Sequence, residues 1–138
     1  MVILMKMKAF LKFLKESLRE VVTGGTGTGA FAGFPIAVSG KTGTAQVFGK
    51  NANGTLKSDT SWFAAYAPTE KPRFAVVMMV SQGGFGASSS GVGVRQIYET
   101  LFGVKGSTVV PGAAIYSDGK PPIKLPKISP ATKVKQTP

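Results

Sequence analysis

The chain has 138 residues, of which 43% are hydrophobic, so it can bury one modest core. Its formal net charge of +11 comes mostly from lysines near the two ends, and no aromatic residues interleave with basic ones in between, which argues against a nucleic-acid partner. The sequence contains neither cysteine nor histidine, which removes thiolate and imidazole chemistry and the commonest zinc ligands. No cofactor is therefore expected, and any nucleophile would be Ser, Thr or Lys.

The first predicted element is an amphipathic helix that ends by Thr23, because Gly24 and Gly25 follow. Its apolar residues recur mostly at spacings of three and four, and they are Met7, Phe10, Leu11, Leu14, Leu18 and Val21. We expect this stripe to pack on a sheet; the alternative is a basic amphipathic helix lying on a membrane. The apolar run before Lys6 is too short to cross a bilayer, so an anchor of the parent protein would lie outside this chain.

Three strands are predicted after a glycine- and threonine-rich loop at residues 23–33. The extended patterns cover residues 35–47, 59–67 and 73–81. In the second, Trp62 is expected on one face and Phe63 on the other. The third is a continuous apolar run, which predicts a strand buried on both faces. Short polar connections indicate an antiparallel meander.

A second amphipathic helix is predicted from Val94 to Leu101 and is closed by Gly103. Residues 104–138 are rich in proline and lysine, which predicts an extended tail after one unit at residues 1–103. The expected fold class is α+β, with an antiparallel sheet and both helices packed on one of its faces.

The most informative stretch is Ser39-Gly40-Lys41-Thr42-Gly43-Thr44-Ala45, for which two interpretations compete. A phosphate-binding P-loop needs a glycine five residues before Gly40, where this chain has Pro35, and it must open a helix. Here the residues after Lys41 continue as a strand, so the P-loop interpretation fails on spacing and on context.

The second interpretation is the K-T-G triad of serine acyl transferases that bind β-lactams. Such a site must hold the carboxylate of a peptide ending in D-alanine. Lys41 would supply a fixed positive charge, and the hydroxyls of Thr42 and Thr44 would supply directional donors. Gly43 keeps the strand free of a side chain that would block the substrate. A backbone N–H just after it can point at a developing oxyanion.

Several stretches together resemble the end of the transpeptidase domain in class B penicillin-binding proteins, especially the actinobacterial type. They are KTGTAQ at 41–46, SWFAAYAP at 61–68, FAVVMMV at 74–80, the loop TGGTGTG at 23–29 and the helix RQIYETLF at 95–102. The resemblance implies part of a five-stranded antiparallel sheet. It also implies roles in catalysis: Lys41 orients the carboxylate and tunes proton transfer, and Thr42 and Thr44 bind the carboxylate. The backbone N–H of Thr44 would be one half of the oxyanion hole.

Two earlier motifs of this family, S-x-x-K and S-x-N, are needed for acylation because the serine and its lysine base must lie within hydrogen-bond reach. The sequence has no S-x-N, and its one S-x-x-K match, Ser117-Asp118-Gly119-Lys120, follows K-T-G and sits in a turn-forming stretch. We interpret that match as chance. The chain alone is therefore expected to be inactive and to need an N-terminal portion that carries both motifs.

The leading hypothesis is part of a D,D-transpeptidase that cross-links peptidoglycan through an acyl-serine intermediate and binds penicillin. Its partners would be a peptidoglycan stem peptide or a β-lactam, at the extracytoplasmic face of a bacterial membrane. One alternative is a binding or structural module with the same fold and no catalysis. Another is a nucleic-acid or membrane-surface binder that uses both basic ends, whose affinity would fall steeply with salt and survive Lys41→Ala.

Overall fold

The computed structural model describes residues 2–110 and 113–114. In chain order the main elements are α1 (Val2–Thr23), α2 (Thr28–Phe31), β1 (Ser39–Ala45), β2 (Thr60–Ala67), β3 (Phe74–Val80), the π-helical turn η1 (Ala87–Gly91) and α3 (Val92–Phe102). A two-stranded ribbon follows, β4 (Val104–Lys105) and β5 (Thr108–Val109). The predicted order of helix, three strands and helix is confirmed, and so is the α+β class.

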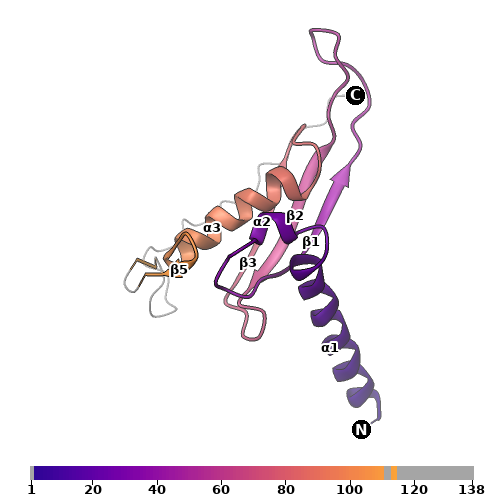
Figure 1. Cartoon of the computed structure of the whole chain (residues 1–138). Helices are drawn as coiled ribbons and strands as arrows, with labels where there is room; N and C mark the ends of the chain where they lie inside the picture. The colour runs from indigo at the N-terminus through magenta and orange to yellow at the C-terminus, as the bar shows by residue number, and fades with distance from the viewer. Residues whose placement is uncertain (1, 111–112, 115–138) are drawn as a thin grey trace, which may run out of the picture.

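The sheet has the strand order β1-β2-β3, and both pairs are antiparallel (Figure 1). The long connection between β1 and β2 extends beyond the end of the sheet as a narrow loop closed by one bridge, Lys50 to Leu56. The connection from β2 to β3 is a short turn, in which the Arg73 N–H donates to the Ala67 carbonyl at 3.0 Å. The predicted meander is therefore confirmed.

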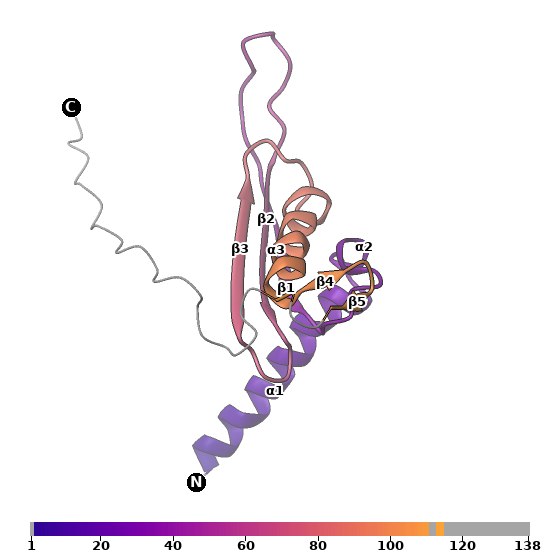
Figure 2. The same cartoon turned by 90° about the vertical axis from the view of Figure 1, so that its left-hand side faces the viewer.

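The core lies between the sheet and α3, which runs along one face of it (Figure 2). Alternate residues of β2 are buried on that face, as the period of a strand requires, and Trp62 is exposed on the other. Phe63 from β2 and Val94 and Tyr98 from α3 are fully buried, and Phe102 packs on Tyr98 with ring centroids 5.9 Å apart. Burial of such side chains stabilises a fold by about 1.5–3 kcal/mol each.

The prediction that the third strand is buried on both faces is wrong. Residues of β3 alternate between half-buried and exposed, and the exposed fractions are 67% for Val77 and 52% for Met79. The physical reason is that α3 covers only one face of the sheet, while within residues 2–110 no helix packs over the other side of β3. An apolar run predicts burial but does not identify the element that provides it.

The prediction that the first helix covers the sheet is correct only for its last turns. Val22 is buried near β1 and Arg19 donates a hydrogen bond to the Val38 carbonyl at 2.7 Å, but the first turns project away from the sheet (Figure 1). The exposed fractions of Phe10 and Leu11 are 64% and 50%. The helix is long enough to run past the end of the sheet, so its stripe is left uncovered there. Across the described helices, none combines the length and the apolar character needed to span a membrane.

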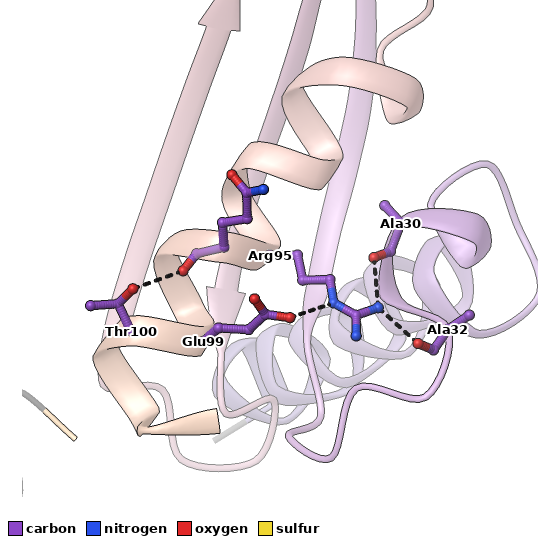
Figure 3. A network of polar contacts seen from close by, with 6 residues as sticks. Ala30, Ala32, Arg95, Glu99 and Thr100 are labelled. Atoms are coloured by element: carbon purple, nitrogen blue, oxygen red, sulfur yellow. Dashed lines mark hydrogen bonds and ion pairs between the residues drawn. The ribbon is translucent and has the colours of Figure 1, made fainter. Parts of the chain in front are cut away.

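The segment predicted as a glycine- and threonine-rich loop contains the short helix α2, whose Phe31 packs against Phe63 at 5.6 Å between ring centroids. Arg95 of α3 fixes this segment, as Figure 3 shows. Its guanidinium donates to the carbonyls of Ala30 and Ala32 at 3.2 and 2.8 Å and pairs with Glu99 at 2.8 Å. The α2 segment is thereby attached to the same helix that covers the sheet.

The β4–β5 ribbon lies within the residues predicted as an extended tail, and the Val110 N–H donates to the Gly103 carbonyl at 2.8 Å. Gly103 has a φ of +67°, the left-handed conformation in which glycine commonly ends a helix. Residues 115–138 lie outside the described part of the chain, and the division at residue 103 stays a prediction.

The buried Tyr98 predicts a loss of stability at alkaline pH. Burial raises the pKa of its phenol well above the usual value of 10.0. Above about pH 10 the unfolded chain releases this proton and the folded chain retains it, so the free energy of unfolding should fall by about 1.4 kcal/mol per pH unit. In denaturant titrations between pH 9 and 11, Tyr98→Phe should flatten this slope.

Phe102→Leu serves as the control for that experiment because Phe102 packs on Tyr98 and carries no ionisable group. It should lower the free energy of unfolding at every pH and leave the slope unchanged. Equal slopes for the native chain and Tyr98→Phe would contradict the prediction.

Candidate functional site

The K-T-G triad lies inside β1, which is an edge strand of the described sheet. Within β1 it cannot open a helix, so the structure excludes the P-loop interpretation. Antiparallel pairing places Thr42 opposite Phe63 and Thr44 opposite Ser61, so both threonines lie on the face that carries α3. Lys41 and Gly43 lie on the other face, opposite Ala64 and Trp62.

Lys41 is exposed, and its ammonium lies over the next residue of the strand. Its Nζ donates to the carbonyl of Thr42 at 2.6 Å and is 3.4 Å from the hydroxyl of Thr42. These contacts place the ammonium beside the K-T-G backbone, at a strand edge that pairs with no further strand in the described chain.

Thr42 is buried, and its hydroxyl makes a contact that the sequence did not predict. Thr42 Oγ1 lies 2.8 Å from Thr26 Oγ1, in the connection between α1 and α2. The turn holding Thr26 is fixed by the Gly27 N–H, which donates to the Val21 carbonyl at 2.8 Å. Thr26, Thr42 and Lys41 thus form one chain of polar contacts. The loop TGGTGTG was noted as a family resemblance, but nothing in its sequence indicated this contact.

Thr44 is exposed and is the more accessible of the two predicted hydroxyls. Its Oγ1 accepts a hydrogen bond from the Gly86 N–H at 3.3 Å, across 42 residues of sequence. Gly43, between the two threonines, has little room for a side chain: an added Cβ would lie 3.2 Å from Cβ of Trp62. Packing against Trp62 therefore favours glycine here, and the role of Gly43 in substrate access stays a prediction.

The structure therefore brings together the predicted residues Lys41, Thr42, Gly43 and Thr44, and it adds Thr26 and Gly86. The S-x-x-K match at Ser117 lies outside the described residues. Ser61 and Ser90 are the buried serines nearest to Thr44, and both hydroxyls bond to backbone carbonyls, so neither is placed to act as a nucleophile. Among the described residues, no group of three or more His, Cys, Asp or Glu side chains could hold a metal ion.

Comparison with known proteins points to one family. The family model described as the penicillin binding protein transpeptidase domain matches residues 8–99. The peptidoglycan D,D-transpeptidase MrdA of Haemophilus influenzae is 36% identical over 95 residues, which cover 62% of this chain and 15% of that protein.

Two solved structures are also similar. Pseudomonas aeruginosa PBP2 in complex with WCK 5153 matches 70% of this chain and 20% of its own, with 26% identity and a TM-score of 0.59. The D,D-transpeptidase domain of a peptidoglycan glycosyltransferase from Eggerthella lenta matches 68% of this chain and 20% of its own, with 34% identity and a TM-score of 0.52. The chain thus spans 15–20% of the length of these relatives.

The resemblance to class B penicillin-binding proteins is confirmed by these relatives, whereas the actinobacterial type stays a prediction. The matched range contains all three strands of the β1-β2-β3 sheet, including the K-T-G strand, and most of α3. The chain belongs to the penicillin-binding protein transpeptidase domain family.

Proposed function

We propose that this chain is the carboxylate-binding part of a serine D,D-transpeptidase that cross-links peptidoglycan outside the cytoplasmic membrane and is acylated by penicillin. The observation that carries the proposal is the edge of β1, which pairs with no further described strand: there the Lys41 ammonium lies against the Thr42 carbonyl, and Thr44 is exposed two residues further along. The reaction class is supported by relatives of this chain that are named as peptidoglycan D,D-transpeptidases.

In the proposed reaction, Lys41 attracts the terminal carboxylate of a stem peptide or β-lactam, and Thr44 donates a hydrogen bond to it. Thr42 contributes through the polar chain with Thr26. A serine from an S-x-x-K segment attacks the penultimate carbonyl and forms an ester bond. The peptide C–N bond breaks, and D-alanine leaves with the proton that the serine hydroxyl gave up. The N–H of Thr44 is proposed as one hydrogen-bond donor to the oxyanion that forms during this attack. Such donors accelerate the reaction because they stabilise the developing negative charge.

We also propose that the chain has no activity alone, because its sequence lacks S-x-N and its S-x-x-K match does not precede K-T-G. The nucleophile would come from an N-terminal portion that carries both motifs, either in a longer parent, which would be membrane-anchored, or in a second chain. The exposed apolar residues of α1 and β3 support this view, since large exposed apolar patches mark interaction surfaces.

Fluorescent penicillin and intact mass spectrometry test the proposal. The isolated chain should carry no adduct. A chimera of the Haemophilus influenzae relative, with the segment matching residues 8–99 replaced by this chain's residues, should be labelled. An adduct on the isolated chain would require a nucleophile here and return attention to Ser117. A folded chimera without label would favour the non-catalytic module.

A further inference from the structure

A buried pair of serine hydroxyls lies directly behind Thr44. Ser61 of β2 and Ser90 of η1 are both fully buried, and their Oγ atoms are 2.7 Å apart. The Ser90 N–H donates to Ser61 Oγ at 3.2 Å, and Ser90 Oγ donates to the Gly86 carbonyl at 2.5 Å. Ser61 Oγ lies 3.1 Å from the same carbonyl. The two hydroxyls therefore hold the Gly86 carbonyl in place.

The nitrogen of Gly86 faces the proposed site. Its N–H donates to Thr44 Oγ1 at 3.3 Å, and Thr44 is the register partner of Ser61. Gly86 is also packed tightly onto the sheet, because an added Cβ would lie 2.5 Å from the carbonyl oxygen of Gly43 and 2.9 Å from that of Trp62. One residue thus connects the buried serine pair to the exposed threonine.

This connection determines which way the Thr44 hydroxyl can donate. A hydroxyl has one proton and two acceptor lone pairs. Because the Gly86 N–H occupies an acceptor position, the proton of Thr44 does not point at Gly86, and the exposure of Thr44 leaves that proton accessible to a ligand. A carboxylate is only an acceptor, so it requires such a directed donor.

We propose that Ser61 and Ser90 are positioning residues, which hold Gly86 so that its N–H orients the Thr44 hydroxyl as a donor to the substrate carboxylate. The inference rests on the proposed function and goes beyond it by assigning a role to two buried residues outside the K-T-G triad. Neither serine touches the substrate, and both act through Gly86 and Thr44.

The test uses the full 138-residue chain, labelled with ¹⁵N and titrated with N-acetyl-D-alanyl-D-alanine. Amide shifts of residues 41–44 report binding of the carboxylate. Ser61→Ala and Ser90→Ala should each raise Kd about fivefold, the effect expected when one hydrogen bond is lost. The matched control is Ser89→Ala, since Ser89 is a half-buried hydroxyl of the same loop that donates to the Gly83 carbonyl. It should leave Kd unchanged.

A double-mutant cycle separates positioning from general stability. In a Thr44→Val background, Ser61→Ala should have no further effect on Kd. An equal effect with and without Thr44 would show that Ser61 acts on the fold, and an unchanged Kd in both serine variants would also overturn the inference. Failure of the native chain to bind the dipeptide would instead count against the proposed carboxylate site itself.

A second measurement does not depend on the folding of variants in the core. Thr44 is exposed, so Thr44→Val should leave the fold intact. The Gly86 amide proton should then shift upfield and exchange faster, because its acceptor is lost. An unchanged Gly86 resonance in Thr44→Val would overturn the proposed link between Gly86 and the site.

Discussion

Replacing Lys41 with alanine in the chimera is expected to slow penicillin acylation about a hundredfold. The side chain supplies the only ammonium that the described structure places against the K-T-G backbone, 2.6 Å from the Thr42 carbonyl. A hydrogen bond to a charged group contributes about 1.5–3 kcal/mol, and each 1.36 kcal/mol corresponds to about tenfold in rate. The loss should be measured as the second-order rate constant of labelling with fluorescent penicillin.

Two control variants show whether the effect depends on a positive charge at position 41 or only on the net charge of the chain. Lys57→Ala removes an exposed lysine from the β1–β2 connection and should leave the rate unchanged. Lys41→Arg keeps the charge but replaces a compact ammonium with a wide planar fork, so an intermediate rate is expected. Equal rates for Lys41→Ala and the native chimera would show that the carboxylate is held elsewhere.

Those parts of the fold that depend on local pattern could be predicted from the sequence. The alternation in β2 placed Phe63 and Trp62 on opposite faces, because side chains of a strand alternate with a period of two, and the structure shows that the Phe63 face is the buried one. The K-T-G triad could be assigned to a strand because the residues around it have no helical spacing. Gly103 marked the end of α3, since glycine readily adopts the left-handed conformation found there.

Burial was predicted less well, since a sequence pattern does not say what covers a surface. The apolar run of β3 and the apolar stripe of α1 were both assigned to the core, yet Val77 and Phe10 are among the most exposed large apolar residues described. Both segments have residues suited to burial, and in the described chain α3 reaches only one side of β3. The sequence therefore predicted which residues are suited to burial, but not which element would cover them.

The contacts behind the site could not be predicted because they join distant residues. Thr26 meets Thr42 across 16 residues, and Gly86 meets Thr44 across 42. The first contact depends on how α1 packs against β1, and the second on how η1 packs against β2, and a short motif does not set that packing. In the sequence, Ser61 and Ser90 have no feature that distinguishes them from other strand and loop residues. The structure places their Oγ atoms 2.7 Å apart.

Phe63→Ala is expected to lower the free energy of unfolding of the isolated chain by about 3–5 kcal/mol, the usual effect of truncating a buried phenylalanine. Phe63 is fully buried in β2, and its ring packs on Phe31 at 5.6 Å between centroids. Because the free energy of unfolding of a domain is only about 5–15 kcal/mol, this substitution would remove a large part of the stability of this small fold. Urea titration followed by circular dichroism measures the change.

The matched control is Val77→Ala on the neighbouring strand, where the side chain is 67% exposed. Its effect should stay within about 0.5 kcal/mol, as for most surface substitutions. Equal effects of the two substitutions would contradict the assignment of the core to the α3 side of the sheet.

The Phe63 ring also connects the core to the proposed site. Phe63 is the register partner of Thr42, and added Cβ atoms at Gly40 of β1 and Gly91 of η1 would lie 2.8 and 3.4 Å from its ring. The ring therefore lies between β1 and the turn that carries Gly86 toward Thr44. Phe63→Leu, which retains most of the apolar volume, should keep the chain folded while loosening that turn. Faster exchange of the Gly86 amide in this variant, at nearly native stability, would show that core packing also sets the geometry behind Thr44.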